Sequence, residues 1–411
     1  MKHGKIVRLV LMMFVQNMVF PLWYNTAATY LATLPGGDRL VPFCVALMGV
    51  GLMIAPVFCM FADRFLDSGH VLAICNLAAA AFLTGAYFTT DATGLLALLF
   101  GATVFLMPTW SIVPAITMAH LPARVFPFVR ASGSLGWAAS AVFSVVGISC
   151  FGIADFDSSA LIFASGAAVA LASALLALTM PPTPPKAKGT PMSVVDALGL
   201  RAFVLLRDRS FAVLSAVLLL AMVPFEWYMG YTSLYLKEAD FRYLNLTQNL
   251  GQVAELGFLF LLPLLFKVCS FKRTMLVGFA ALVVRYVCFS AAALTGLHAF
   301  DFGGILVHGL VFGVLVVAVQ VHAAEIAPPE LRNQAQGFVM FLTGGVGMFL
   351  SVGVFARILR ACTVAETGLH DWRVPYLTAL ALSVLALVLF AVFYRTPAQP
   401  SRESTQGDIH E

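Results

Sequence analysis

The sequence has very little charge. Only 11% of its 411 residues are Asp, Glu, Lys or Arg, while 61% are hydrophobic. Soluble globular chains carry about 25% charged residues. Too little charge is present here to cover a surface that faces water, so we exclude a soluble globular enzyme and expect a lipid bilayer as the solvent. The net charge of +4 is small for this length and gives no indication of nucleic-acid binding.

Cysteine is also sparse, and none of it forms a CxxC pair. The seven cysteines are scattered along the chain, and an odd number argues against a framework of disulfides. Zinc sites need clustered ligands. We therefore expect small buried cysteines, no metal site and no cofactor. The sequence also lacks a nucleophile–base pair and a phosphate-binding loop, so the prediction is that the protein is not an enzyme.

Long apolar runs fill most of the chain. A helix crosses the bilayer with about 20 apolar residues, because the hydrocarbon core is about 30 Å thick and each residue rises about 1.5 Å. The sequence therefore predicts an all-α integral membrane protein with twelve transmembrane helices. The expected spans are 6–34, 40–61, 70–89, 94–120, 128–153, 158–180, 211–236, 246–268, 273–296, 302–326, 336–361 and 372–394.

The twelve spans divide into two sets of six at a polar segment that begins with the proline-rich run 181–185. Proline cannot continue a helix, so this segment predicts a linker. The expected organisation is an N-terminal six-helix half at 1–180, a cytoplasmic linker at 181–210, a C-terminal six-helix half at 211–394 and a cytoplasmic tail at 395–411.

The orientation follows from Lys and Arg, which gather in cytoplasmic loops. Most of the 24 Lys and Arg residues fall on the side that holds both termini and the linker. We therefore expect both termini to be cytoplasmic.

Several ionisable residues fall inside the expected spans, and five of them are expected to lie in the membrane interior. A charged group at the bilayer centre costs at least about 2.5–3.5 kcal/mol, so such groups normally face a partner or water. These five lie on different spans, which indicates a shared polar interior. They are Arg130, Glu226, Glu255, Arg285 and His308.

Arg130, Ser134 and Trp137 are spaced i, i+4, i+7 and share one helix face. A guanidinium offers several hydrogen-bond donors, and an aromatic ring one turn away can stack on a planar ligand. This favours a ligand-binding face. The alternative is an arginine that packs against neighbouring helices and bonds to their carbonyls.

Gln252 and Glu255 lie three residues apart on the eighth expected span. An amide and a carboxylate can bond hydroxyl groups or the edge of a planar ring, and a buried carboxylate can also carry a proton. The alternative is a structural glutamate paired with Arg285 of the same half.

His308 and Phe312 are spaced i, i+4 on the tenth span, where they form a ligand face or ordinary helix packing. Glu226 lies in an aromatic stretch of the seventh span. It can be a substrate contact, a proton site or a glutamate near the membrane interface.

The order and spacing of these residues resemble the nucleoside:proton symporter family of the major facilitator superfamily. The resemblance covers nearly the whole chain, and its most specific stretch is Phe126-Pro127-Phe128-Val129-Arg130 followed by Gly133-Ser134-Leu135-Gly136-Trp137. Further matching positions are Gln16, Trp23 and Tyr30, the turn Ala62-Asp63-Arg64-Phe65-Leu66, Met107-Pro108-Thr109, Leu198-Gly199-Leu200, Gln252-Val253-Ala254-Glu255, Arg285-Tyr286, Arg332, Ala335-Gln336-Gly337 and Asp371-Trp372.

The resemblance implies a monomeric secondary active transporter of a bacterial inner membrane, which imports nucleosides by proton symport with alternating access. The proton would be the coupling ion and would bind to Glu255, with Glu226 as a second acid. The implied substrate pocket is central, between the two halves. Its residues would be Arg130, Ser134, Trp137, Gln252, Glu255, His308 and Phe312.

The chain departs from the family pattern near the implied pocket. The family has a carboxylate directly after the aromatic residue of the tenth span, where this chain has Gly313. The polar and aromatic residues that follow in the family are replaced here by the apolar residues Val314 to Val317. In the fourth span, Pro114-Ala115 stands where the family has Asn-Ser. Two alternatives therefore stay open: a carrier of the same fold for another solute, such as a sugar or a drug, and a membrane receptor that does not transport.

Overall fold

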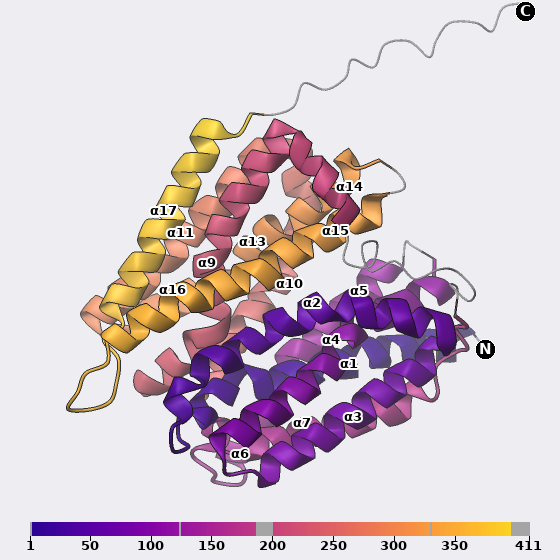
Figure 1. Ribbon diagram of the computed structural model, residues 1–411, viewed down its shortest axis with the longest axis horizontal. Coiled ribbons are helices and arrows are strands. Elements are labelled where there is room, and N and C mark those ends of the chain that lie inside the picture. Colours follow the sequence, from indigo (N-terminus) through magenta and orange to yellow (C-terminus); the bar gives the residue numbers. More distant parts are fainter. Residues whose placement is uncertain (1, 123–124, 186–199, 329–330, 396–411) are drawn as a thin grey trace, which may run out of the picture.

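The computed structural model describes residues 2–122, 125–185, 200–328 and 331–395, and these residues are almost entirely helical (Figure 1). The first part of the chain forms α1 (Lys2–Leu31), α2 (Val41–Phe65), α3 (Ser68–Phe88), α4 (Ala92–His120), α5 (Phe126–Ala139), α6 (Ala141–Ser149) and α7 (Leu161–Ala177). The second part forms α9 (Arg209–Glu238), α10 (Leu244–Val268), α11 (Phe271–Thr295), α12 (His298–Leu306), α13 (His308–Phe312), α14 (Val319–Ile326), α15 (Arg332–Met340), α16 (Gly347–Ala361) and α17 (Arg373–Phe393).

Each of the twelve expected spans is occupied by one helix or by a run of consecutive helices. Within the described residues, nine helical segments are long and apolar enough to cross a bilayer. Two shorter apolar helical segments, Val41–Pro56 and Leu161–Ala177, occupy two of the remaining spans. The predicted all-α fold is confirmed.

Polar caps at the helix ends explain where several spans begin. The side chains of Asp67, Asp91, Asp208 and Ser270 each accept a hydrogen bond from a backbone N–H in the first turn of α3, α4, α9 and α11. Such a cap satisfies one of the N–H groups that a helix start leaves without a partner. A polar residue therefore marks the start of each of these four helices.

Two expected spans contain a π-helical turn. These turns cover Gly313–Ala318, between α13 and α14, and Phe341–Val346, between α15 and α16. π-Helical turns inside α-helices are rare and often lie at functional sites.

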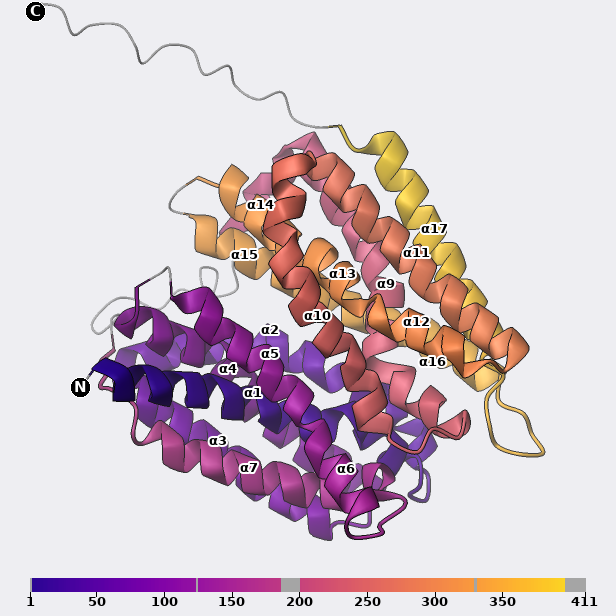
Figure 2. The same ribbon diagram turned by 180° about the vertical axis from the view of Figure 1, so that it is seen from behind.

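The helices lie in two groups, which Figures 1 and 2 show from opposite sides. The first group is α1 to α7 and the second group is α9 to α17. Helices α1, α2, α5 and α6 contact α9, α10 and α16 across the interface between the groups. The boundaries at 180 and 211 remain a proposal, because residues 186–199 of the expected linker and 396–411 of the expected tail lie outside the described residues.

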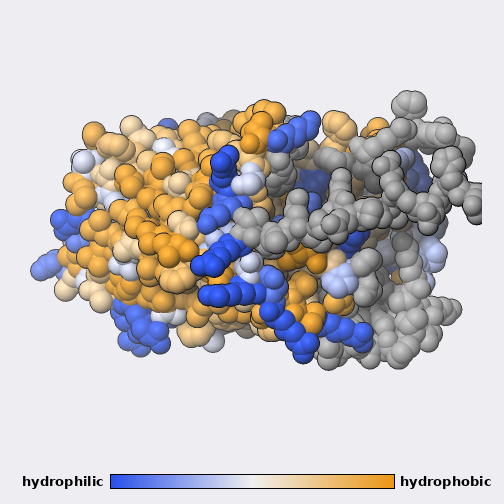
Figure 3. Space-filling model, turned by 90° about the horizontal axis from the view of Figure 1, so that it is seen from above, coloured by the Kyte–Doolittle hydropathy of each residue, from blue (hydrophilic) through white to orange (hydrophobic). Residues whose placement is uncertain are grey.

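The surface carries many large hydrophobic side chains, and Figure 3 shows them across much of the face that it presents. Phe88 and Phe151 are each 74% exposed, and Leu175 is 60% exposed. Such a surface is typical of a protein that faces lipid. The expectation of buried cysteines is confirmed for Cys44 and Cys75, but Cys150 at the end of α6 is exposed and the other four are half-buried.

Hydrogen bonds join the two groups at the end of the molecule far from the N-terminus, which we call the closed end. Asn25, near the end of α1, donates to Asn245 Oδ1 at the start of α10 over 2.9 Å. Asn249 donates to Ser140 Oγ, between α5 and α6, over 3.0 Å. Further side-chain hydrogen bonds between the two groups at this end join Ser149 to Tyr243 and Asp157 to the Asn245 backbone N–H.

Candidate functional site

Helix α5 is held against α1 by a close backbone approach. A Cβ atom at Gly136 would lie 2.0 Å from the Phe14 carbonyl oxygen, so only glycine fits at this crossing. Along α5, the Arg130 side chain is exposed, Ser134 is buried and Trp137 is half-buried. The Trp137 ring packs against Trp110 of α4 with ring centroids 5.7 Å apart.

Helix α10 brings Glu255 of the second group to this face of the first. Glu255 is 4% exposed, and the charge of Arg130 and the hydroxyl of Ser134 both act on its carboxyl group. Arg130 and Ser134 of α5 therefore meet Glu255 of α10 across the interface between the two helix groups, and all three are residues of the predicted site. A cation and a hydroxyl of the first group therefore lie beside this carboxyl group of the second.

Helix α13 lies directly on α10 at Gly309. A Cβ atom there would lie 2.5 Å from the Cα of Glu255, so a larger residue would push the helices apart. This contact places His308 Nε2 at 3.1 Å from Gln252 Nε2 and 3.9 Å from Glu255 Oε2. The Phe312 ring lies 5.9 Å from the His308 ring.

Arg285 of α11 supports His308 from the other side. Its Nη2 atom lies 3.0 Å from His308 Nδ1, and the guanidinium carbon lies 4.2 Å from the Tyr228 ring centroid. The alternative of a Glu255–Arg285 pair is not what the structure contains, because Arg285 bonds to His308. Sequence analysis missed Phe225 and Tyr228, whose rings lie 6.0 and 5.2 Å from the His308 ring.

The structure does not bring Glu226 into this group of side chains. Glu226 is 3% exposed, and its Oε2 atom is buried without a hydrogen-bond partner. It lies within electrostatic reach of Tyr24 on α1 and Tyr286 on α11. The Tyr286 hydroxyl donates to the Pro224 carbonyl, which fixes α11 against α9 beside Glu226.

The position that departs most from the family pattern, Gly313, has open space around it. No atom lies within 4 Å of the place where its Cβ would be. It borders an apolar pocket of about 280 Å³ whose lining includes Phe258 and Leu310. The missing carboxylate is therefore not replaced by another acid in this pocket.

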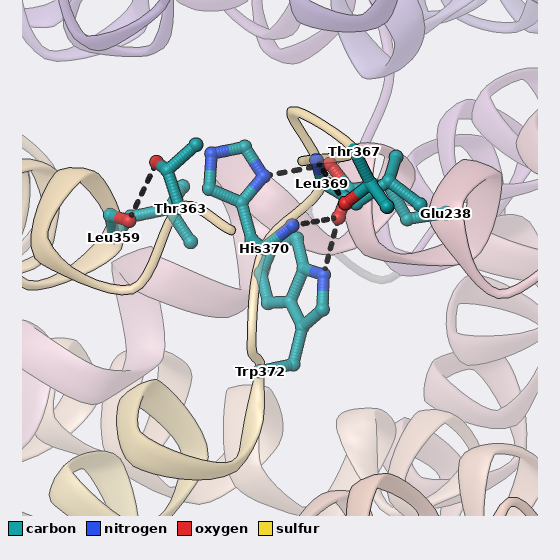
Figure 4. A network of polar contacts seen from close by, with 7 residues as sticks. All are labelled: Glu238, Leu359, Thr363, Thr367, Leu369, His370 and Trp372. Atoms are coloured by element: carbon teal, nitrogen blue, oxygen red, sulfur yellow. Dashed lines mark hydrogen bonds and ion pairs between the residues drawn. The ribbon is translucent and has the colours of Figure 1, made fainter. Parts of the chain in front are cut away.

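A separate polar cluster lies near the closed end of the second group (Figure 4). The Glu238 carboxylate at the end of α9 lies 2.7 Å from His370 Nδ1 and accepts from Trp372 Nε1 over 2.8 Å. Both partners belong to the loop between α16 and α17. Glu238 and His370 also line a pocket of about 300 Å³. Because the carboxylate is fully bonded within the protein, we assign this cluster a structural role.

Comparison with protein families gives one match across the chain. Residues 3–399 match the family model described as "Nucleoside H+ symporter". The chain is 28% identical over 405 residues to a putative nucleoside transporter, YegT, of Escherichia coli strain K12, covering 94% of this chain and 93% of the relative. It is 24% identical to the xanthosine permease of the same organism, covering 98% of this chain and 99% of the relative.

Solved structures of transporters share the fold. The nucleoside transporter NupG superposes with a TM-score of 0.80 at 20% identity, covering 95% of this chain and 99% of that chain. A D-xylose-proton symporter superposes with a TM-score of 0.74 at 15% identity, covering 95% and 98%. At these identities the likeness establishes the fold, which is the predicted major facilitator fold of two six-helix halves.

Proposed function

The chain belongs to the nucleoside H⁺ symporter family and is a membrane transporter rather than an enzyme, and from this premise we propose which of its residues bind the nucleoside and the proton. Arg130 and Gln252 bond the nucleoside, Trp137 and Phe312 stack on it, and Ser134 and His308 complete the pocket. Glu255 binds the coupling proton. Glu226 is a second proton site that acts in a different step of the cycle.

The meeting of Glu255 with Arg130 and Ser134 carries this proposal. It joins one helix from each group, so substrate or proton binding at this point affects how the two groups sit against each other. Arg130 is exposed, while Trp137, Gln252 and Phe312 are half-buried, so these side chains have free surface to offer a ligand. A midplane site between two repeats is the arrangement that alternating access requires.

Orientation follows from charge. Lys2, Lys5 and Arg8 lie at the N-terminal end, and the linker adds further basic residues, so we infer a cytoplasmic N-terminus in a bacterial inner membrane. The closed end then faces the periplasm, and the conformation described here is closed on the outside. A monomer in the lipid bilayer is sufficient for this mechanism.

The test is uptake of radiolabelled uridine and adenosine into proteoliposomes, with and without an inward proton gradient. We compare wild type with Glu255→Gln, which keeps the shape of the side chain but cannot release a proton. Loss of a charge-assisted bond costs about 1.5–3 kcal/mol, so gradient-driven uptake should fall about 10- to 100-fold.

Glu238→Gln is the matched control, because it changes a glutamate that lies outside the proposed site. It should keep the gradient response. Uptake that ignores the gradient in wild type would make the protein a uniporter. If the proton gradient still stimulates uptake by Glu255→Gln, Glu255 does not take part in proton coupling.

A further inference from the structure

His308 is held by polar neighbours on two sides. Its side chain is 1% exposed, with Arg285 Nη2 at 3.0 Å from Nδ1 and Gln252 Nε2 at 3.1 Å from Nε2. Glu255 Oε2 lies 3.9 Å from the same Nε2 atom. Three helices, α10, α11 and α13, therefore converge on one imidazole ring.

The chemistry of Arg285 determines which ring nitrogen carries the proton. A guanidinium has only donors, so His308 Nδ1 must accept the bond from Nη2 with its lone pair. The proton of a neutral imidazole then resides on Nε2. A second positive charge 3.0 Å from a buried guanidinium is strongly unfavourable, which keeps the ring neutral.

The proton on Nε2 in turn determines the orientation of Gln252. An N–H cannot bond to the NH₂ group of an amide, because both are donors. The amide of Gln252 therefore turns its oxygen toward His308, and its NH₂ group is left to bond elsewhere. Gln252 is half-buried, so this donor has accessible surface around it.

Arg285 has few polar partners among the residues that the structure describes. The residue is fully buried, and its Nε and Nη1 atoms have no hydrogen-bond partner. Its guanidinium lies over the rings of Tyr228 and Phe225, which hold it in place by cation–π attraction. Within the described part of the chain, its side-chain hydrogen bond is to His308.

We propose that Arg285 is a positioning residue that fixes His308 as the Nε2–H tautomer and thereby presents the Gln252 NH₂ group to the nucleoside. The site then selects ligands with an acceptor atom, such as a carbonyl oxygen or a ring nitrogen of the base, opposite Gln252. The specificity step rests on the proposed function, because it requires the nucleoside to bind between α5 and α10. The tautomer step does not.

The tautomer is tested directly by ¹⁵N NMR of histidine-labelled protein in lipid nanodiscs at neutral pH. The His308 signals are those that disappear in His308→Gln. We expect an unprotonated Nδ1 and a protonated Nε2 in wild type, and a mixture of tautomers in Arg285→Met, which removes the donor. A wild-type ring that is protonated on Nδ1, or on both nitrogens, overturns the proposal.

The orientation of Gln252 is tested by a pair of substitutions at position 308. Glutamine in His308→Gln can accept from Arg285 and donate to Gln252, as the proposed histidine does. Glutamate in His308→Glu has only acceptors and turns the Gln252 amide around. Because a misdirected buried polar group costs about 1–3 kcal/mol, uridine should bind at least about fivefold more weakly to His308→Glu than to His308→Gln.

Equal uridine affinity in the two variants, both shown to be folded by thermal unfolding, overturns the link from His308 to Gln252. If wild type binds neither uridine nor adenosine, the proposed function fails, while the NMR result still decides the tautomer. The two failures are therefore distinct. Rescue of the wild-type tautomer by Arg285→Lys, which restores a cationic donor, separates positioning from general packing.

Discussion

Glu255 and Glu226 are both buried glutamates of the second group, yet their surroundings differ. Glu255 lies within reach of Arg130, Ser134 and His308. Glu226 is equally buried, but its Oε2 atom has no partner. One carboxyl group therefore has a cation and donors around it, and the other has aromatic and apolar neighbours.

Because of this difference, the two carboxyl groups can bind and release protons differently. An ionised carboxylate without a partner is too costly in a low-dielectric interior, so Glu226 holds its proton in this conformation. Glu255 can exchange its proton here, because Arg130 compensates the charge that is left. We therefore propose that Glu255 exchanges its proton with the open side in this conformation, and that Glu226 exchanges its own proton only when the other side opens.

After the loss expected for Glu255→Gln, the next largest effect on transport is expected from Glu226→Gln. A permanent amide imitates the protonated acid, so the closed end should open less readily and the proton gradient should stimulate uptake about two- to tenfold less than in wild type. Proteoliposome uptake across a range of external pH measures this. A variant with unchanged proton coupling would restrict Glu226 to a packing role.

The sequence predicted the fold well because apolar run length is a direct physical requirement of the bilayer. It also predicted a shared polar interior, where the structure places Arg130, Ser134, Gln252, Glu255 and His308 near one another; their binding role stays a proposal. It did not predict that Arg285 bonds to His308 rather than to Glu255. That outcome depends on the packing of α13 on α10 at Gly309, which no periodicity along a single helix reveals.

The sequence left three alternatives open for Glu226, because the packing of its helix against other helices cannot be deduced from periodicity. Its sequence neighbours Phe225, Trp227 and Tyr228 indicate an aromatic helix, but not which face meets α1. The Asn245–Asn25 contact at the closed end was not predicted either, because both residues lie near helix ends where polar residues are common. Contacts between halves are the part of this fold that a single sequence leaves undetermined.

A smaller effect is expected at Asp157, which lies in the loop before α7 at the closed end. Its Oδ2 atom accepts from the Ser144 hydroxyl over 2.7 Å and from the Asn245 backbone N–H of α10 over 3.2 Å. Burial raises the pKa of the Asp157 carboxyl above its ordinary value. Proton binding therefore favours closure: the contribution is present at low pH and is lost as pH rises through the raised pKa.

Asp157→Asn should remove this pH dependence, because asparagine can accept both bonds without a charge. Hydrogen–deuterium exchange of residues 241–250 at two pH values measures it. Wild type should exchange faster at the higher pH, and the variant should exchange at a nearly constant rate after correction for intrinsic exchange. A pH dependence that persists in Asp157→Asn would assign the effect to another group at the closed end.

The smallest effect on transport is expected from Glu238→Gln, which tests a half-buried carboxylate against the two buried ones. Glu238 accepts from Trp372 Nε1 and the His370 backbone N–H, and lies 2.7 Å from His370 Nδ1, so all its bonds serve the loop between α16 and α17. An amide keeps part of this bonding, and the free energy of unfolding should fall by about 1 kcal/mol. Thermal unfolding in detergent should therefore shift downward while gradient-driven uptake per folded protein stays at the wild-type level. A loss of proton coupling in Glu238→Gln would show that the cluster around Glu238 affects Glu255. It would contradict a purely structural role for Glu238.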